Sequence, residues 1–117
     1  MASTTINDYY SIGMSNTMIV LKVNIENTQL SRSTVRLNKQ LIGDYNDSFS
    51  VSLGSANEIL GSILYIDTTE TDIDPDADMI SFAIELSGGT NPYKNQRAQT
   101  VSPGGYVLYT AEIALIP

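Results

Sequence analysis

The sequence predicts an all-β fold, namely an antiparallel sandwich of two sheets with six to eight strands and one short helical turn. Three observations support this prediction. Apolar and polar residues alternate with a period of two along most apolar segments, as in strands that bury one face. Ile, Leu, Val and Tyr dominate the apolar residues, and Ser, Thr and Asn are abundant, which favours strands and turns. No segment has the length of the helices that connect parallel strands.

The length of the chain predicts one domain. With 117 residues it is close to the most common domain size, so residues 1–117 are expected to form a single β-sandwich. The strand spacing suits a Greek-key or jelly-roll-like order, and the sequence does not distinguish between the two. There is no cysteine, so disulfide bonds do not contribute to the stability of this fold.

The first half of the chain contains four expected strands. The first covers residues 4–9. The second covers residues 18–27 and has an apolar face made of Ile19, Leu21, Val23 and Ile25, with a polar face made of Lys22, Asn24 and Glu26. In two shorter strands, at residues 34–38 and 48–53, the core positions are Val35, Leu37, Phe49, Val51 and Leu53. A turn is predicted between these two strands at residues 43–47, because Gly, Asp and Asn cluster there.

The second half begins with a predicted helical turn. Ser55 and Glu58 match a capping box, and Gly61 can end the helix after one turn. Residues 62–67 are apolar with little alternation, which is typical of a strand central to its sheet. Two alternating strands follow, with core positions at Ile80, Phe82, Ile84 and Leu86, and at Val107, Tyr109, Ala111, Ile113 and Leu115.

An acidic loop is predicted at residues 67–78, between the strands at 62–67 and 80–86. It contains four alternating aspartates, Asp72, Asp74, Asp76 and Asp78, whose oxygens suit a calcium ion. The EF-hand pattern is absent, because Ala77 and Ala83 replace its glycine and its closing glutamate. A calcium site shared with Asp44 and Asp47 of a second loop is one interpretation. The other is a solvated hairpin loop with no cofactor.

A second candidate site lies in the long connection at residues 88–105. Such connections usually contain further structure or carry function. Glycines flank a group of amphipathic and hydrogen-bonding residues that suits a protein or glycan partner, namely Tyr93, Lys94, Asn95 and Arg97. The alternative interpretation is a short edge strand at residues 97–101.

Charge and composition limit the classes of function. The net charge of −7 disfavours binding to nucleic acid. Between Lys39 and Lys94 there are ten acidic residues and no Lys or Arg, an asymmetry that suits head-to-tail association of identical copies or a basic partner. The chain has no His and no Cys, so catalysis would depend on Lys or on carboxylate pairs such as Asp44 with Asp47 or Asp72 with Asp74. No enzymatic activity is expected.

The function expected from the sequence is a non-catalytic β-sandwich module that binds a protein, a glycan or its own copies. A calcium-dependent binding module is the alternative, and a carboxylate-based hydrolase is a distant third. No apolar run has the length of a membrane span. No secretory signal is recognisable, so the compartment stays open, with the cytoplasm as the default unless a leader has been removed.

Overall fold

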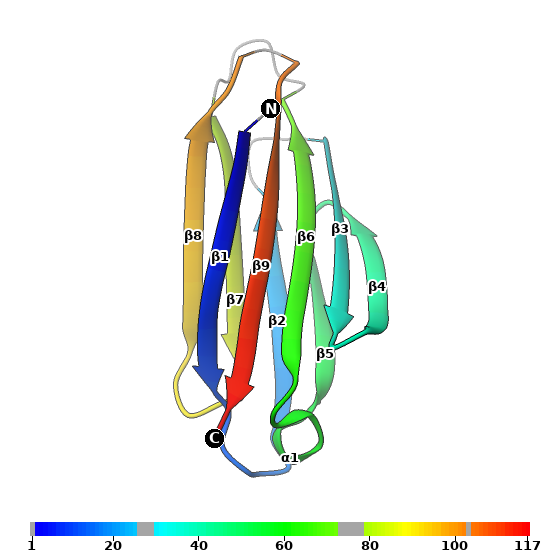
Figure 1. Ribbon diagram of the computed structural model, residues 1–117, viewed down its shortest axis with the longest axis vertical. Helices are drawn as coiled ribbons and strands as arrows, with labels where there is room; N and C mark the ends of the chain where they lie inside the picture. Colours follow the sequence, from blue (N-terminus) through cyan, green and yellow to red (C-terminus); the bar gives the residue numbers. More distant parts are fainter. Residues whose placement is uncertain (1, 26–29, 73–78, 103) are drawn as a thin grey trace.

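The computed structural model describes residues 2–25, 30–72, 79–102 and 104–117. Two β-sheets pack face to face in an elongated sandwich (Figure 1), which confirms the predicted fold class. The described residues form nine strands and a one-turn helix. In chain order these are β1 (Ala2–Ser11), β2 (Met18–Ile25), β3 (Leu30–Leu37), β4 (Gln40–Asn46), β5 (Phe49–Ser55), α1 (Ala56–Ile59), β6 (Ile63–Thr71), β7 (Met79–Ser87), β8 (Tyr93–Thr100) and β9 (Tyr106–Ile116).

The two sheets differ in size and in strand direction. The five-stranded sheet has the order β1-β9-β6-β3-β4, and the four-stranded sheet has the order β5-β2-β7-β8. All neighbouring strands are antiparallel except β1 and β9, which are parallel. This pair differs from the wholly antiparallel prediction. After β1 the chain crosses to β2 in the opposite sheet, so no hairpin joins β1 to β9. Strands that are not joined by a hairpin can pair in parallel.

The core lies between the sheets and consists of the residues that the alternation predicts. In β2, Ile19, Leu21 and Val23 are fully buried, whereas Lys22 is exposed. In the centre of the sandwich the Phe82 ring of β7 stacks on the Tyr109 ring of β9, with 4.7 Å between ring centroids. Burying a side chain of this size stabilises the fold by about 1.5–3 kcal/mol.

The local predictions at α1 and β6 are confirmed. Glu58 and Ser55 form the capping box of α1. Gly61 follows the helix with a φ of +88°, a conformation that glycine adopts without strain. The strand predicted at residues 62–67 is part of β6, the middle strand of the five-stranded sheet. No helix among the described residues is long and apolar enough to cross a membrane.

Two edge strands differ from the prediction and raise the strand number to nine. The turn predicted at residues 43–47 belongs mostly to β4, and the chain reverses at Asp47, where φ is +68°. The connection predicted at residues 88–105 contains β8, which is longer than the alternative strand at residues 97–101. Gly88 begins the turn before β8 with a φ of +96°, and a Cβ there would lie 2.1 Å from the Met18 carbonyl oxygen.

Candidate functional site

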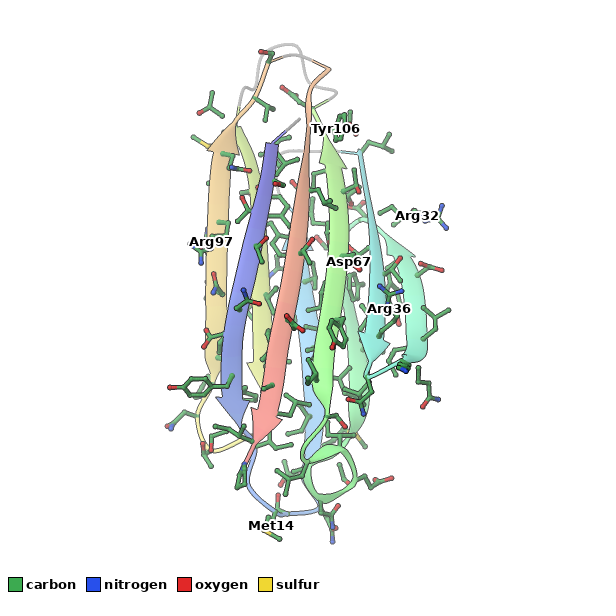
Figure 2. The ribbon with its side chains drawn as sticks, viewed as in Figure 1. Met14, Arg32, Arg36, Asp67, Arg97 and Tyr106 are labelled. Carbon is green, nitrogen blue, oxygen red and sulfur yellow. The ribbon has the colours of Figure 1, made fainter. Side chains whose placement is uncertain are left out.

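The outer surface of the five-stranded sheet over β3 and β6 carries two hollows and an ion pair. We call it the β3/β6 face. Strand pairing places Arg32 opposite Thr69, Thr34 opposite Asp67, and Arg36 opposite Tyr65. Figure 2 shows Arg36 and Asp67 side by side on these two strands. Because the residues come from distant parts of the chain, only the β3–β6 pairing brings them together.

Two hollows lie on the β3/β6 face, each with a volume of about 490 Å³. One is lined by Arg36, Asn38, Lys39 and Tyr65. The other lies towards Leu30 and Thr71 and includes Asp67 in its lining. Arg36 Nη2 donates to Asp67 Oδ2 at 2.9 Å, and the two side chains are 46% and 36% exposed. This ion pair joins the lining of one hollow to that of the other, which makes the face continuous.

The chemistry of the β3/β6 face suits a polar ligand. Its hydrogen-bonding groups are the guanidinium groups of Arg32 and Arg36, the Asn38 amide and the threonine hydroxyls. Tyr65 adds the apolar surface of a ring. The volume of each hollow lies within the range of small-molecule sites. The Arg36–Asp67 pair is too exposed to contribute more than about 1 kcal/mol to stability, so its stabilising effect does not explain the site.

A second cluster lies inside the sandwich, on the inner surface of β3 and β6. Ser33 Oγ and Thr68 Oγ1 are buried and 2.7 Å apart, so they form a hydrogen bond. Glu70 is fully buried, and neither of its carboxylate oxygens has a hydrogen-bond partner among the described residues. Burial raises the pKa of Glu70 to about 8. Burial, and secondarily the charge of Glu70, raises the pKa of Tyr109 to about 12.

The position of Glu70 was not predicted, although the sequence contains a signal for it. The prediction ended the strand at residue 67 and assigned the acids after it to a loop. Leu64 and Ile66 face the core, and continuing their alternation places Thr68, Glu70 and Asp72 on the same side. A strand that continues its period-two pattern with polar residues is therefore a sequence signature of a polar interior.

Of the four aspartates predicted to bind calcium, Asp72 lies within the described residues, whereas Asp74, Asp76 and Asp78 lie outside them. Asp72 is only 1% exposed, so its side chain is inside the fold. In the described part of the chain, no group of three or more acidic side chains is arranged to hold a metal ion.

Asp44 and Asp47, predicted to supply a second calcium loop, are exposed on β4 and in the turn after it. Asp44 Oδ1 accepts a hydrogen bond from Thr34 Oγ1 at 2.6 Å. Asp47 Oδ1 accepts one from the backbone N–H of Ser48 at 3.1 Å. Both carboxylates therefore have local structural roles, and neither is part of a buried acidic pair.

The residues predicted to bind a partner, Tyr93, Lys94, Asn95 and Arg97, lie on β8 and not at a loop tip. Tyr93 donates a hydrogen bond to Asp8 Oδ2 at 2.9 Å, and its ring lies 5.8 Å from that of Tyr10. Tyr93 therefore helps to join β8 to β1. Lys94 and Arg97 are exposed. Of the predicted set, Tyr93 therefore has a structural role, whereas Lys94 and Arg97 face the solvent.

Comparison of the chain with protein-family models, with curated proteins and with solved structures gave no match.

Proposed function

We propose that the protein is a non-catalytic binding module that holds a glycan on the β3/β6 face. The observation that carries the proposal is the pair of adjoining hollows. Together they place the Tyr65 ring, guanidinium and amide groups and threonine hydroxyls on one continuous surface.

Sugar rings combine hydroxyl groups with apolar C–H faces. Arginine and asparagine can hydrogen-bond to two adjacent hydroxyls at once, and threonine to one. The Tyr65 ring offers an apolar surface with a polar edge, as such amphipathic contacts require. The Arg36–Asp67 pair is half-exposed, so a hydroxyl-rich ligand can reach both partners without leaving a charge buried.

The same features favour a glycan over a protein partner. The cores of protein interfaces are usually apolar and enriched in aromatic residues. On the β3/β6 face Leu30, which is 61% exposed, is the main exposed apolar side chain. Its neighbours in that hollow are mostly threonines and charged residues. The two hollows are lined by three cationic side chains, Arg32, Arg36 and Lys39, and by one acid, Asp67, so the face carries a net positive charge.

The test is isothermal titration with a panel of soluble neutral and acidic polysaccharides. Tyr65→Ala and Arg36→Ala should each weaken binding by about 10-fold or more, because residues that anchor a ligand contribute on the order of 1–3 kcal/mol. Lys22→Ala is the matched control, since Lys22 is exposed on the opposite sheet. The proposal fails if no polysaccharide binds, or if binding occurs and both substitutions on the face leave it unchanged.

A calcium-dependent module is the second candidate function. It is favoured by the unpartnered carboxylate of Glu70, which lies two residues from the buried Asp72. A buried carboxylate without hydrogen bonds is costly unless it is neutral or bound to a cation. The effect of calcium on the Tm distinguishes a neutral Glu70 from one bound to a cation.

A further inference from the structure

Each side of the sandwich ends in two edge strands, one from each sheet. On one side these are β1 and β8, which we call the β1/β8 edge. On the other side they are β4 and β5, the β4/β5 edge. Figure 1 shows β8 and β4 at opposite sides of the molecule. Each edge strand pairs with one neighbour in its own sheet and leaves its other side unpaired among the described residues.

Strand direction makes the two edges complementary. In the four-stranded sheet all pairs are antiparallel, so β5 and β8 run in opposite directions. A five-stranded sheet with only antiparallel pairs would have edge strands that run the same way. Here the parallel β1–β9 pair reverses one of them, so β1 and β4 also run in opposite directions. A second copy displaced sideways would therefore meet both edges with antiparallel strands, the commoner form of pairing.

The charges at the two edges are also complementary. β8 carries Lys94 and Arg97 and has no acidic residue. At the other side, Asp44 lies on β4 and Asp47 in the turn before β5. All four side chains are exposed. Each edge also has one charge of the other sign nearby, since Asp8 lies on β1 and Lys39 lies in the turn before β4.

One cation and one acid of the two edges lie at a similar height along the molecule. Figure 2 places Arg97 at nearly the same level on the long axis as Asp67. Asp67 is in register with Thr34, which is in register with Asp44 on the opposite edge. A sideways displacement therefore brings Arg97 of one molecule to the level of Asp44 of the next.

We propose that the protein associates with copies of itself through its lateral edges, with the β1/β8 edge of one molecule against the β4/β5 edge of the next. Strand addition of this kind uses backbone hydrogen bonds for affinity and side chains for specificity. The contact is heterologous, because two different surfaces meet. It does not close on itself unless a rotation intervenes, so the product is an open row of molecules.

The same charges act against a symmetric dimer. Pairing of β8 with β8 of another copy would bring Lys94 and Arg97 close to their own counterparts. Pairing of two β4/β5 edges would do the same for Asp44 and Asp47. Like charges across an interface cost several kcal/mol, and charged residues on edge strands normally prevent unwanted pairing. The charges therefore select head-to-tail pairing over both symmetric alternatives.

The experiment compares two edge variants with the wild-type protein by sedimentation velocity over a range of concentrations at low salt. The first variant, Lys94→Glu with Arg97→Glu, makes the β1/β8 edge acidic. The second, Asp44→Lys with Asp47→Asn, makes the β4/β5 edge basic and retains at position 47 a side chain that tolerates positive φ. Lys22→Glu on the outer surface of the four-stranded sheet is the control. Unchanged melting temperatures confirm that the variants are folded.

Wild-type protein and the control should form a concentration-dependent series of species beyond dimers. This series should shrink in about 1 M salt, where the screening length falls to about 3 Å. Each edge variant alone should associate about 10-fold more weakly or not at all. An equimolar mixture of the two should associate again, because each basic edge then meets an acidic one. A wild-type protein that stays monomeric, or that stops at a dimer, overturns the proposal, as does a mixture that remains monomeric.

Discussion

Glu70 is fully buried in the described core, and both of its carboxylate oxygens lack a hydrogen-bond partner there. Its neighbours in the sheet are Ser31 and Val107, and neither supplies a hydrogen bond to the carboxylate. The hydroxyl pair of Ser33 and Thr68 shows that this region can satisfy polar groups, so Glu70 is an exception within it. A carboxyl group in this position is stable when it holds a proton, because the neutral form loses much less hydration free energy on burial.

The first prediction at this scale concerns pH. The pKa of Glu70 is raised in the folded state to about 8 from an ordinary value of 4.5. Between these values the folded state holds a proton that the unfolded state has lost. The contribution of Glu70 to the free energy of unfolding should therefore be largest below pH 4.5. This contribution should fall as the pH rises towards 8, by at most about 1.4 kcal/mol per pH unit.

Glu70→Gln should remove this dependence and raise the free energy of unfolding at pH 8 by roughly 1–3 kcal/mol, since the amide carries no charge to bury. Urea denaturation at a series of pH values measures the effect. Glu58→Gln is the control, because Glu58 is exposed and its pKa is lowered by hydrogen bonds from Ser55. If the wild-type protein and Glu70→Gln show the same pH dependence of stability, Glu70 does not retain a proton in the fold and the prediction is wrong.

At the scale of the strands, a strand can be predicted from the sequence when one of its faces is buried and the other is exposed to water. In β2 and β9 one face meets the other sheet and the other face meets water, so the sequence alternates clearly. β4 and β8 lie at sheet edges, where the free side and much of both faces meet solvent. Their sequences carry no alternation, and β8 exists as a strand because it pairs with β7. Propensity and pattern cannot show such tertiary pairing.

The prediction for strand orientation uses adjacent residues of β2. Val23→Asp should destabilise the protein by about 3–5 kcal/mol or prevent folding, because it places an unpaired charge in the core. Lys22→Asp should change stability by less than about 1 kcal/mol, because this side chain is exposed. Thermal denaturation followed by circular dichroism measures both. Equal tolerance of the two substitutions would mean that the faces of β2 are assigned incorrectly.

At the scale of the whole molecule, the candidate sites depend on strand order, which the sequence does not reveal. Arg36 and Tyr65 are separated by 28 residues in the chain, and they become neighbours only because β3 pairs with β6. The sequence-based candidates, by contrast, are local clusters or, for calcium, two local clusters assumed to meet, since pairing between distant segments is not visible in one dimension. The charge asymmetry along the chain is visible in the sequence. That these charges lie on opposite edges of the molecule follows only from the sheet topology.

The distribution of acids also bears on whether the folded protein holds a cation. Asp72 and Glu70, both within the acidic segment predicted at 67–78, occupy inner positions near the end of β6. A cation that binds ionised carboxylates and only the folded state stabilises it by mass action, by about 2.7 kcal/mol when the ligand is present at 100 times its dissociation constant.

The calcium hypothesis therefore predicts that millimolar calcium raises the Tm of the wild-type protein by several degrees. The rise should be larger above the pKa of Glu70 than below it, because a protonated carboxyl does not bind the ion. Asp72→Asn should abolish the rise, whereas Asp47→Asn, in an exposed turn, should leave it unchanged. Differential scanning calorimetry with and without calcium, and with magnesium as a second control, measures these shifts. Equal Tm values with and without calcium would exclude this function and leave Glu70 as a buried, protonated carboxyl group.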